Sequence, residues 1–118
     1  MEIFVTGATG VLGREVVRLL AGAGHHVRAL SRSPSNDALL SRLGAQPVRG
    51  DLFDAASLSA AVAGCEAVLH LATRIPPRSR ATSPDAWAEN HRIRIEGTRT
   101  LVDAALDAKA SIFIYPSV

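Results

Sequence analysis

The chain has 118 residues, which is enough for one domain and too few for two. Hydrophobic residues make up 47% of it, so a buried core is expected, and the formal net charge is only +2, which does not indicate a nucleic-acid-binding protein. The single cysteine, Cys65, allows no internal disulfide, and no apolar run is long enough to span a membrane. The first strand starts directly after Met1 and leaves no room for a signal peptide, so we expect a cytoplasmic protein.

The first expected element is a short apolar strand that leads through three glycines into a helix. The strand covers residues 3–5, the glycines are Gly7, Gly10 and Gly13, and a helical pattern starts at Val11. Glycine lets a ligand approach the main chain, and the first turn of a helix offers free N–H groups and a partial positive charge to an anion. The pattern predicts a dinucleotide diphosphate site; the alternative is a tight glycine turn without a ligand.

Strands and helices then alternate along the rest of the chain. Further strands are expected at residues 27–30, 46–49, 67–71 and 111–115, and helices at residues 11–23, 36–43, 55–63 and 84–108. Asp54 is expected to cap the third helix, and Ser83, followed by Pro84, the long fourth helix. This alternation predicts an α/β fold with a doubly wound parallel sheet, and right-handed crossovers give the strand order 3-2-1-4-5.

Two helices carry apolar stripes that predict which side is buried. On the first helix the stripe consists of Leu12, Val16, Leu19 and Leu20. On the long helix it consists of Trp87, His91, Ile95, Val102 and Ala105. Gly97 interrupts the long helix, and we expect it where the helix backbone packs closely on the sheet.

Four short motifs occur in order along the chain. They are residues 6–13 (TGATGVLG), 50–52 (GDL), 70–72 (HLA), and 96–98 with 101–105 (EGT and LVDAA). Together they resemble the motifs of the N-terminal part of the extended short-chain dehydrogenase/reductase family, the NAD-dependent epimerase/dehydratase group. The resemblance covers the whole chain. It implies one NAD(P)-binding Rossmann domain, residues 1–118, that is truncated after strand five and lacks the C-terminal catalytic and substrate part.

The resemblance also implies which residues contact the cofactor. The glycines would line the diphosphate, with backbone N–H groups of the first helical turn on its oxygens. Asp51 would accept a hydrogen bond from the adenine amino group, and Ser117 would lie near the nicotinamide end as the one catalytic candidate in this chain. The full cofactor set is Gly7, Thr9, Gly10, Val11, Leu12, Gly13, Ser31, Arg32, Asp51, Leu52, Ala72 and Thr73.

The end of the second strand bears on the choice between NADP(H) and NAD(H). NAD enzymes place an acidic residue there to hold the ribose hydroxyls, whereas this chain has Ser31 followed by Arg32. An arginine can pair with a 2′-phosphate. We therefore favour NADP(H), with NAD(H) as the other candidate; Arg32 as a solvated turn residue is the alternative reading.

The chain departs from the family in two further places. Arg94 stands where the family often has an asparagine, and Asn90, one turn earlier, either substitutes for it or is a surface residue. The family's catalytic Tyr-x-x-x-Lys lies beyond strand five and is absent from this chain, because Tyr115 lies within the last strand and has no lysine four residues on.

Some remaining polar residues have a structural and a functional interpretation. His70 is expected to be a packed core residue rather than a catalyst, and Cys65 a buried thiol. Arg74, Arg78 and Arg80 either guide an anionic ligand or form a solvated loop. No Cys, His or acidic cluster has metal-ligand spacing, so no metal site is predicted.

The sequence thus favours the cofactor-binding module of an NADP-dependent reductase, dehydrogenase or epimerase, inactive by itself because the tyrosine and lysine are missing. A small-molecule substrate is expected if the chain is completed. The alternative is a non-catalytic NADP-responsive sensor or assembly protein. We also expect a homodimer or larger assembly through the last strand and the long helix, and neither nucleic acid nor membrane as a partner.

Overall fold

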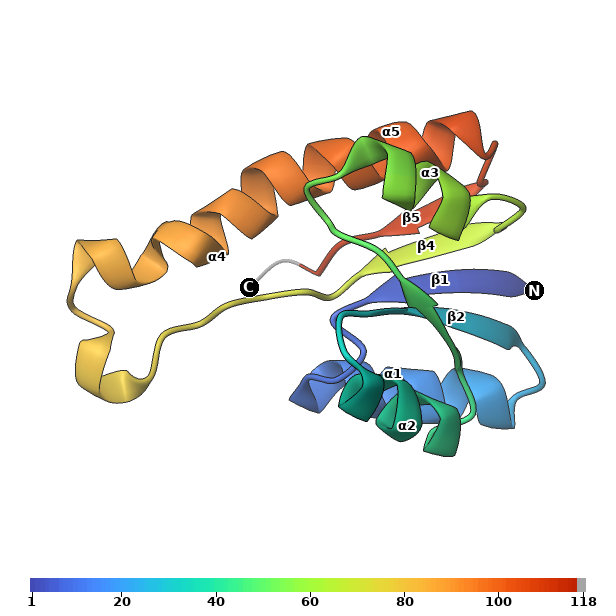
Figure 1. Cartoon of the computed structure of the whole chain (residues 1–118), viewed down its shortest axis with the longest axis horizontal. Coiled ribbons are helices and arrows are strands. Elements are labelled where there is room, and N and C mark those ends of the chain that lie inside the picture. The colour runs from blue at the N-terminus through green and yellow to red at the C-terminus, as the bar shows by residue number, and fades with distance from the viewer. Residues whose placement is uncertain (117–118) are drawn as a thin grey trace.

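The computed structural model describes residues 1–116, which form a five-stranded parallel sheet flanked by helices (Figure 1). The strands are β1 (Glu2–Thr6), β2 (His26–Ser31), β3 (Gln46–Arg49), β4 (Ala67–His70) and β5 (Ile112–Ile114). Their order is β3-β2-β1-β4-β5, with Val5 of β1 opposite Ala29 of β2 and Leu69 of β4. The predicted doubly wound sheet and its strand order are confirmed.

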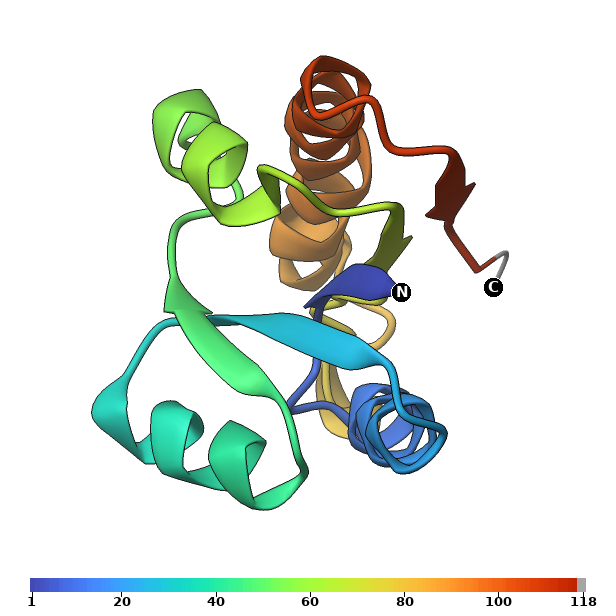
Figure 2. The same ribbon diagram turned by 90° about the vertical axis from the view of Figure 1, so that its right-hand side faces the viewer.

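Helices cover both faces of the sheet (Figure 2). One layer contains α1 (Val11–Gly22) and α2 (Pro34–Arg42); the other contains α3 (Ala55–Val62) and α5 (Thr98–Asp107). Side chains of β1 alternate between the two layers, because successive residues of a strand point to opposite faces. Val5 packs with Leu40 in one core cluster, whereas Phe4 packs with Leu58 and Leu101 in the other. The apolar run of residues 3–5 in β1 is explained by this burial on both faces.

Side-chain caps fix where two of the helices begin. The Asp54 side chain accepts the Ala56 amide at 3.1 Å at the start of α3, as predicted. Ser33 accepts the Asn36 amide at 3.2 Å, so α2 starts at Pro34, two residues before the expected position. Ser83 precedes the first turn and Pro84 opens it, as predicted, but the Ser83 side chain makes no capping bond.

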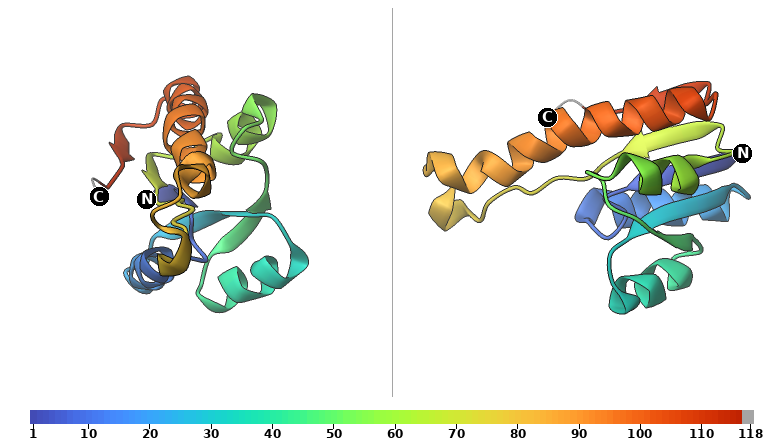
Figure 3. Two further views of the ribbon diagram at one scale, coloured as in Figure 1. Left: turned by 90° about the vertical axis from the view of Figure 1, so that its left-hand side faces the viewer. Right: turned by 45° about the horizontal axis from the view of Figure 1, so that its top comes forward.

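The long fourth helix consists of several turns of different geometry. They are the 3₁₀ turn η2 (Pro84–Trp87), α4 (Ala88–Arg92), the π-helical turn η3 (Ile93–Gly97) and α5. Together with the preceding loop, which contains the 3₁₀ turn η1 (Arg78–Arg80), α4 extends beyond the carboxyl ends of the strands (Figure 3). The helix therefore overhangs the edge where ligands bind in open α/β sheets.

The predicted buried stripe of the long helix is wrong in its first half. Ala105 is buried as predicted, but His91 is exposed and Ile95 is 62% exposed; the buried residues are Asn90, Ile93, Gly97, Leu101, Ala104 and Ala105. The prediction followed the largest side chains, whereas this stripe includes a glycine and a polar residue. A Cβ on Gly97 would lie 2.7 Å from Leu52 Cδ2, so the close approach is to the loop after β3 rather than to the sheet.

The predicted stripe of α1 is also displaced. Leu12 and Leu19 are exposed, and Gly13 and Val17 are the buried residues of this helix. The displacement arises because Gly13 brings the helix backbone directly onto the loop before it. Of the predicted stripe, Leu20 packs against the core cluster and Val16 is half-buried, whereas Leu12 and Leu19 face outward.

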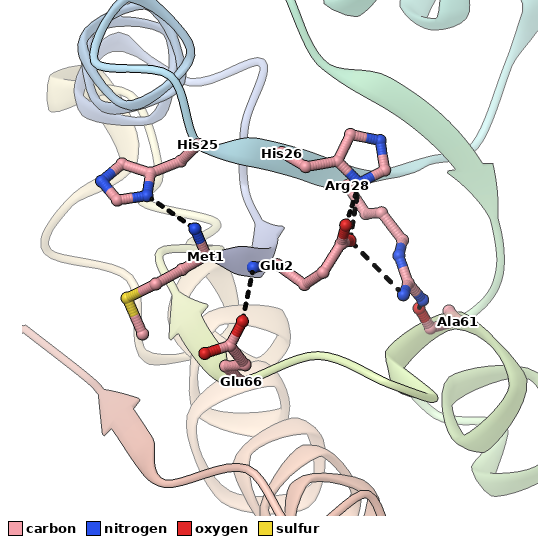
Figure 4. A network of polar contacts seen from close by, with 7 residues as sticks. All are labelled: Met1, Glu2, His25, His26, Arg28, Ala61 and Glu66. Carbon is pink, nitrogen blue, oxygen red and sulfur yellow. Dashed lines mark hydrogen bonds and ion pairs between the residues drawn. The ribbon is translucent and has the colours of Figure 1, made fainter.

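Polar contacts tie the amino ends of the strands together, at the edge opposite the overhanging helix (Figure 4). Glu2 contacts His26 Nδ1 at 2.6 Å and Arg28 Nη2 at 3.6 Å, and Arg28 also donates to the Ala61 carbonyl at 2.8 Å. The hydrogen bond from His26 is the main reason that the pKa of Glu2 is lowered. These contacts link β1 and β2 to α3.

Within residues 1–116, no helix has the length and apolar character that crossing a bilayer requires. The cytoplasmic location expected from the sequence stays a prediction.

Candidate functional site

The loop between β1 and α1 is shaped by the close approach of two backbones. Gly7 has φ +70°, and a Cβ there would lie 2.5 Å from the backbone nitrogen of Ala72, just after β4. The Gly10 N–H donates to the Gly7 carbonyl at 3.1 Å and closes the turn. Because β1 is flanked by β2 and β4, this loop lies at the point where the strand order reverses, which is where ligands bind in such sheets.

The start of α1 exposes main-chain donors beside that loop. A Cβ on Gly13 would overlap the Gly7 carbonyl oxygen, so only glycine lets the helix come this close. The Arg14 N–H donates to the Gly10 carbonyl at 3.0 Å, which leaves the amides of Val11, Leu12 and Gly13 without an acceptor inside the helix. Val11 is 95% exposed, so its amide rather than its side chain belongs to the site.

A pocket of about 250 Å³ opens next to this loop. Eight of the predicted cofactor residues line it: Gly7, Thr9, Gly10, Arg32, Asp51, Leu52, Ala72 and Thr73. The sequence interpretation missed the pocket residues Ala8, Leu30, Asn36, Phe53, Leu71, Glu89 and Ile93, and left Arg74 undecided. The pocket thus runs from the end of β2 to the end of β4.

Four predicted cofactor residues do not line the pocket. Val11, Leu12 and Gly13 lie in the first turn of α1, where they can contribute only backbone groups. Ser31 is buried and does not reach the pocket. Ser117 lies outside the described residues.

Ser31 instead takes part in a polar cluster behind the end of β2. Its hydroxyl donates to Asp37 Oδ1, and Arg49 Nη2 donates to Asp37 Oδ2 at 2.7 Å. These bonds, that from Arg49 first, lower the pKa of Asp37. The only signal of this cluster in the sequence is the acidic residue Asp37 in the first turn of α2.

Arg32 lines the pocket near the end of β2 and brings a positive charge to it. Among the ion pairs formed by residues 1–116, none involves Arg32, whereas Arg49 is neutralised by Asp37. At the other end, Arg74 lines the pocket but Arg78 and Arg80 do not. Of the three loop arginines, only the first therefore lies where an anion in this pocket could reach it.

The loop after β3 lines the pocket, and hydrogen bonds fix its backbone. Asp51 Oδ1 accepts the Phe53 amide at 2.9 Å, and the Asp51 amide donates to Ser57 Oγ at 3.0 Å. Leu52 belongs to the core cluster and also lines the pocket. The missed neighbour Phe53 follows directly in the sequence, where its position after the 50–52 motif was the available signal.

The end of β4 is fixed by a buried hydrogen-bonded histidine. Thr6 Oγ1 lies 2.7 Å from His70 Nδ1 and accepts the Ala72 amide at 3.3 Å. Burial is the main cause that lowers the pKa of His70, and the Ile93 carbonyl opposes it. The expectation of a packed histidine is confirmed, since His70 is fully buried.

Asn90 and Arg94 connect the overhanging helix to the ends of β4 and β5. Asn90 is buried and its Oδ1 accepts the Arg74 amide at 2.9 Å, so the surface-residue alternative for it is wrong. Arg94 Nε donates to Tyr115 Oη at 3.0 Å, and Tyr115 stacks on His70 with ring centroids 5.2 Å apart.

Together, the switch-point loop, the free amides of α1 and the pocket beside them define a Rossmann-like α/β protein. The chain belongs to the NAD dependent epimerase/dehydratase family, which matches residues 3–117. It is 38% identical over 117 residues to 4-hydroxy-2-methyl-3-oxo-4-farnesyl-3,4-dihydroquinoline-1-oxide ketoreductase of Stigmatella aurantiaca, which covers 99% of this chain and 33% of that protein.

Two further similarities bear on function. The chain is 36% identical over 118 residues to the photosystem II assembly factor Ycf39 of Cyanophora paradoxa, covering 100% of this chain and 34% of that protein. A solved short-chain dehydrogenase/reductase superfamily protein from Agrobacterium tumefaciens, with bound NAD, is 35% identical at a TM-score of 0.74, over 96% of this chain and 31% of that one. The chain spans about a third of the length of these relatives.

Proposed function

We propose that residues 1–118 form an NAD(P)-binding domain, and that its glycine corner holds the cofactor diphosphate. The carrying observation is that the amides of Val11, Leu12 and Gly13 have no acceptor inside the helix, beside a pocket that Gly7 and Gly10 line. Gly7 and Gly13 allow this arrangement, because a Cβ on either would collide with neighbouring backbone. First-turn amides of α1 face an anion at that place and the helix dipole favours it. The bound NAD of the Agrobacterium relative supports this proposal.

We place the remaining cofactor contacts along the residues that line the pocket. The adenosine half lies against Arg32, Asp51 and Leu52, and the nicotinamide half against Ala72 and Thr73. Support comes from the pocket, which contains all five residues and joins the end of β2 to the end of β4. Ser31 does not line the pocket; its hydroxyl donates to Asp37, which also pairs with Arg49.

We propose NADP(H) as the preferred cofactor. Arg32 has no ion-pair partner within residues 1–116, and the nearest acidic group behind β2, Asp37, is paired with Arg49. A guanidinium free to pair with a 2′-phosphate strengthens binding through charge-assisted hydrogen bonds. Because such a bond contributes about 1.5–3 kcal/mol, its loss weakens binding about tenfold or more.

Calorimetric titration with NADPH and NADH tests both parts of this proposal. NADPH should bind more tightly, and Arg32→Gln should remove most of that difference while NADH binding changes little. Arg42→Gln, at the far end of α2, is the matched control and should retain it. Binding of neither dinucleotide would contradict the domain assignment, and equal binding of both would contradict the NADP preference alone.

For the chemistry we propose the redox half of a carbonyl reductase or related enzyme. A bound nicotinamide supplies or accepts a hydride, and the ketoreductase relative supports a carbonyl-containing small molecule as the substrate. The Tyr-x-x-x-Lys motif that moves the proton in this family does not occur in residues 1–118, because the one tyrosine, Tyr115, has no lysine four residues on. We therefore expect residues 1–118 to bind the cofactor without turnover.

A non-catalytic role in assembly is the second candidate. The specific observation is the 36% identity to a photosystem II assembly factor. On this hypothesis the cofactor changes an interaction rather than a substrate. A cofactor-dependent change in the partners retained by the protein, with no hydride transfer by the full-length gene product, favours it over the enzyme.

We also propose that the protein self-associates through α5 and β5. β5 is an edge strand with β4 as its one partner in the described sheet, and Leu106 of α5 is 68% exposed. Ile112 and Ile114 of β5 are exposed as well. Unpaired strand edges and exposed apolar side chains of this kind favour association with another copy.

A further inference from the structure

A second pocket, of about 270 Å³, lies beneath the overhanging helix. It shares Ala72 and Thr73 with the dinucleotide pocket, so the two are contiguous at the end of β4. The strand order places this pocket on the β4–β5 side, opposite the end of β2. If the cofactor lies as proposed, with its adenosine half at the end of β2, the second pocket lies at the nicotinamide end.

The walls of this pocket are largely apolar. Trp87, Ile75 and Tyr115 are among its lining residues, and Tyr115 lies flat on the ring of His70. Burial lowers the pKa of His70, which keeps that imidazole uncharged at neutral pH. Flat aromatic and aliphatic surfaces favour a ligand whose body is apolar or aromatic.

Arg94 is the one permanently charged side chain among the residues that line this pocket. Its Nε donates to Tyr115 Oη at 3.0 Å, which anchors one edge of the guanidinium. No ion pair among residues 1–116 includes Arg94. Its remaining N–H groups are therefore available to an anion, since an arginine has five donors in a planar fork.

Arg92, on the same long helix, differs from Arg94 because it has an ion-pair partner. It is paired with Glu96 at 3.2 Å, and its guanidinium lies 3.8 Å from the centre of the Phe53 ring. Both its charge and its flat face are thus occupied. Arg94, two residues later, lines the apolar pocket. Its Nε–H is bonded to Tyr115, and its other N–H groups are in no ion pair among residues 1–116.

We propose that this second pocket binds a small organic acid, with its carboxylate on Arg94 and its apolar or aromatic body between Trp87 and Ile75. Taken with the proposed function, on which this last step rests, the substrate of the complete protein is a carbonyl compound with a carboxylate group. A carboxylate matches the planar guanidinium in two parallel hydrogen bonds, and a neutral amide of the same shape does not. Arg94 is then a specificity residue rather than a catalytic one.

Two probes of the same shape separate the effect of the ligand's negative charge from that of its apolar body. They are 3-phenylpropionate and its neutral amide, 3-phenylpropionamide. Trp87 is the only tryptophan of the chain and lines the pocket, so its fluorescence reports occupancy directly. The acid should bind about tenfold more tightly than the amide, as expected for a charge-assisted hydrogen bond in a partly desolvated site. Arg94→Gln should reduce that ratio to about one.

Arg99→Gln is the matched control, because Arg99 is exposed on the same helix and does not line the pocket. It should keep the ratio of the unchanged protein. Every sample is also titrated with NADPH, which Arg94→Gln should bind as before. Normal NADPH binding with no preference for the acid would overturn this inference and leave the cofactor assignment standing. Preference for the acid without NADPH binding would support the anion site and contradict the cofactor assignment.

An acid preference that persists in Arg94→Gln would also overturn the inference, because the anion would then be held elsewhere. Unfolding temperatures of the variants accompany the titrations. Since Arg94 and Arg99 are both exposed, neither change should lower the unfolding temperature appreciably.

Discussion

Gly13 makes the tightest backbone contact of the site, because its α-carbon faces the Gly7 carbonyl with no space for a methyl group. Gly13→Ala should therefore push α1 away from the loop and weaken dinucleotide binding at least tenfold. Overpacking of this kind costs about 1–3 kcal/mol of stability. Calorimetric titration with NADPH and thermal unfolding measure the two effects.

Gly22→Ala is the control for that substitution within the same helix. Nothing lies within 4 Å of a Cβ built on Gly22, so alanine should fit. It should leave NADPH binding unchanged and raise stability by up to about 1 kcal/mol, the difference in helix propensity. Equal NADPH affinity in both variants would contradict the role given to Gly13.

The lowered pKa of His70 allows a prediction of how the free energy of unfolding depends on pH. Burial lowers the pKa of His70 below its ordinary value of 6.5, so the unfolded chain binds the proton first as the pH falls. Stability is then complete above about pH 6.5 and declines as the pH falls from there towards the folded-state pKa.

His70→Gln removes this group, so its unfolding temperature should vary less between neutral pH and about pH 5. His91→Gln, on an exposed position of α4, is the control and should follow the unchanged protein. Parallel pH dependences for His70→Gln and the unchanged protein would show that another group is responsible.

At the scale of the elements, α3 depends on its cap. Asp54 accepts the Ala56 amide, one of the donors that a helix start leaves without a partner. Asp54→Ala should lower the free energy of unfolding by about 1 kcal/mol, and Asp54→Ser should restore most of it. Denaturant midpoints for the three proteins measure this. A loss as large in the serine variant as in the alanine variant would assign the effect to something other than the cap.

Apolar runs and turn residues predicted the elements well, but the buried faces of two helices less so. β1 and β4 each contain a run of three apolar residues because both sheet faces are covered, and such runs can be recognised from the local sequence. On α1 and the long helix the closest contacts are made by Gly13 and Gly97. A stripe predicted from large side chains misses the contacts of a glycine, because a glycine packs closely by having no side chain.

For the molecule as a whole, some residues of the site could be predicted from the sequence, whereas others are brought together only by the fold. The glycine loop and the residues after β3 and β4 are continuous in sequence, so their motifs predicted most of the pocket. Glu89 on the overhanging helix reaches the pocket, and Asp37 reaches Ser31 behind β2, only through the packing of separate elements. The free Arg94 could be found from its replacement of an asparagine, but its contact with Tyr115 required the fold.

Self-association is a property of the whole molecule. If α5 and β5 form the contact, the protein should scatter light as a dimer or larger assembly, and Leu106→Glu should shift it towards the monomer. Leu19→Glu is the matched control, because Leu19 is 60% exposed on α1, in the other helical layer. A monomer at high concentration without any substitution would contradict the proposed contact.

The most direct test of the account is to follow the backbone amides by nuclear magnetic resonance while NADP⁺ is added. If the corner between β1 and α1 holds the diphosphate, the amide signals of Gly7, Gly10, Val11, Leu12 and Gly13 should shift most and saturate together. Saturable shifts confined to other parts of the chain, such as the arginine turn Arg78–Arg80, or the absence of any shift, would contradict it.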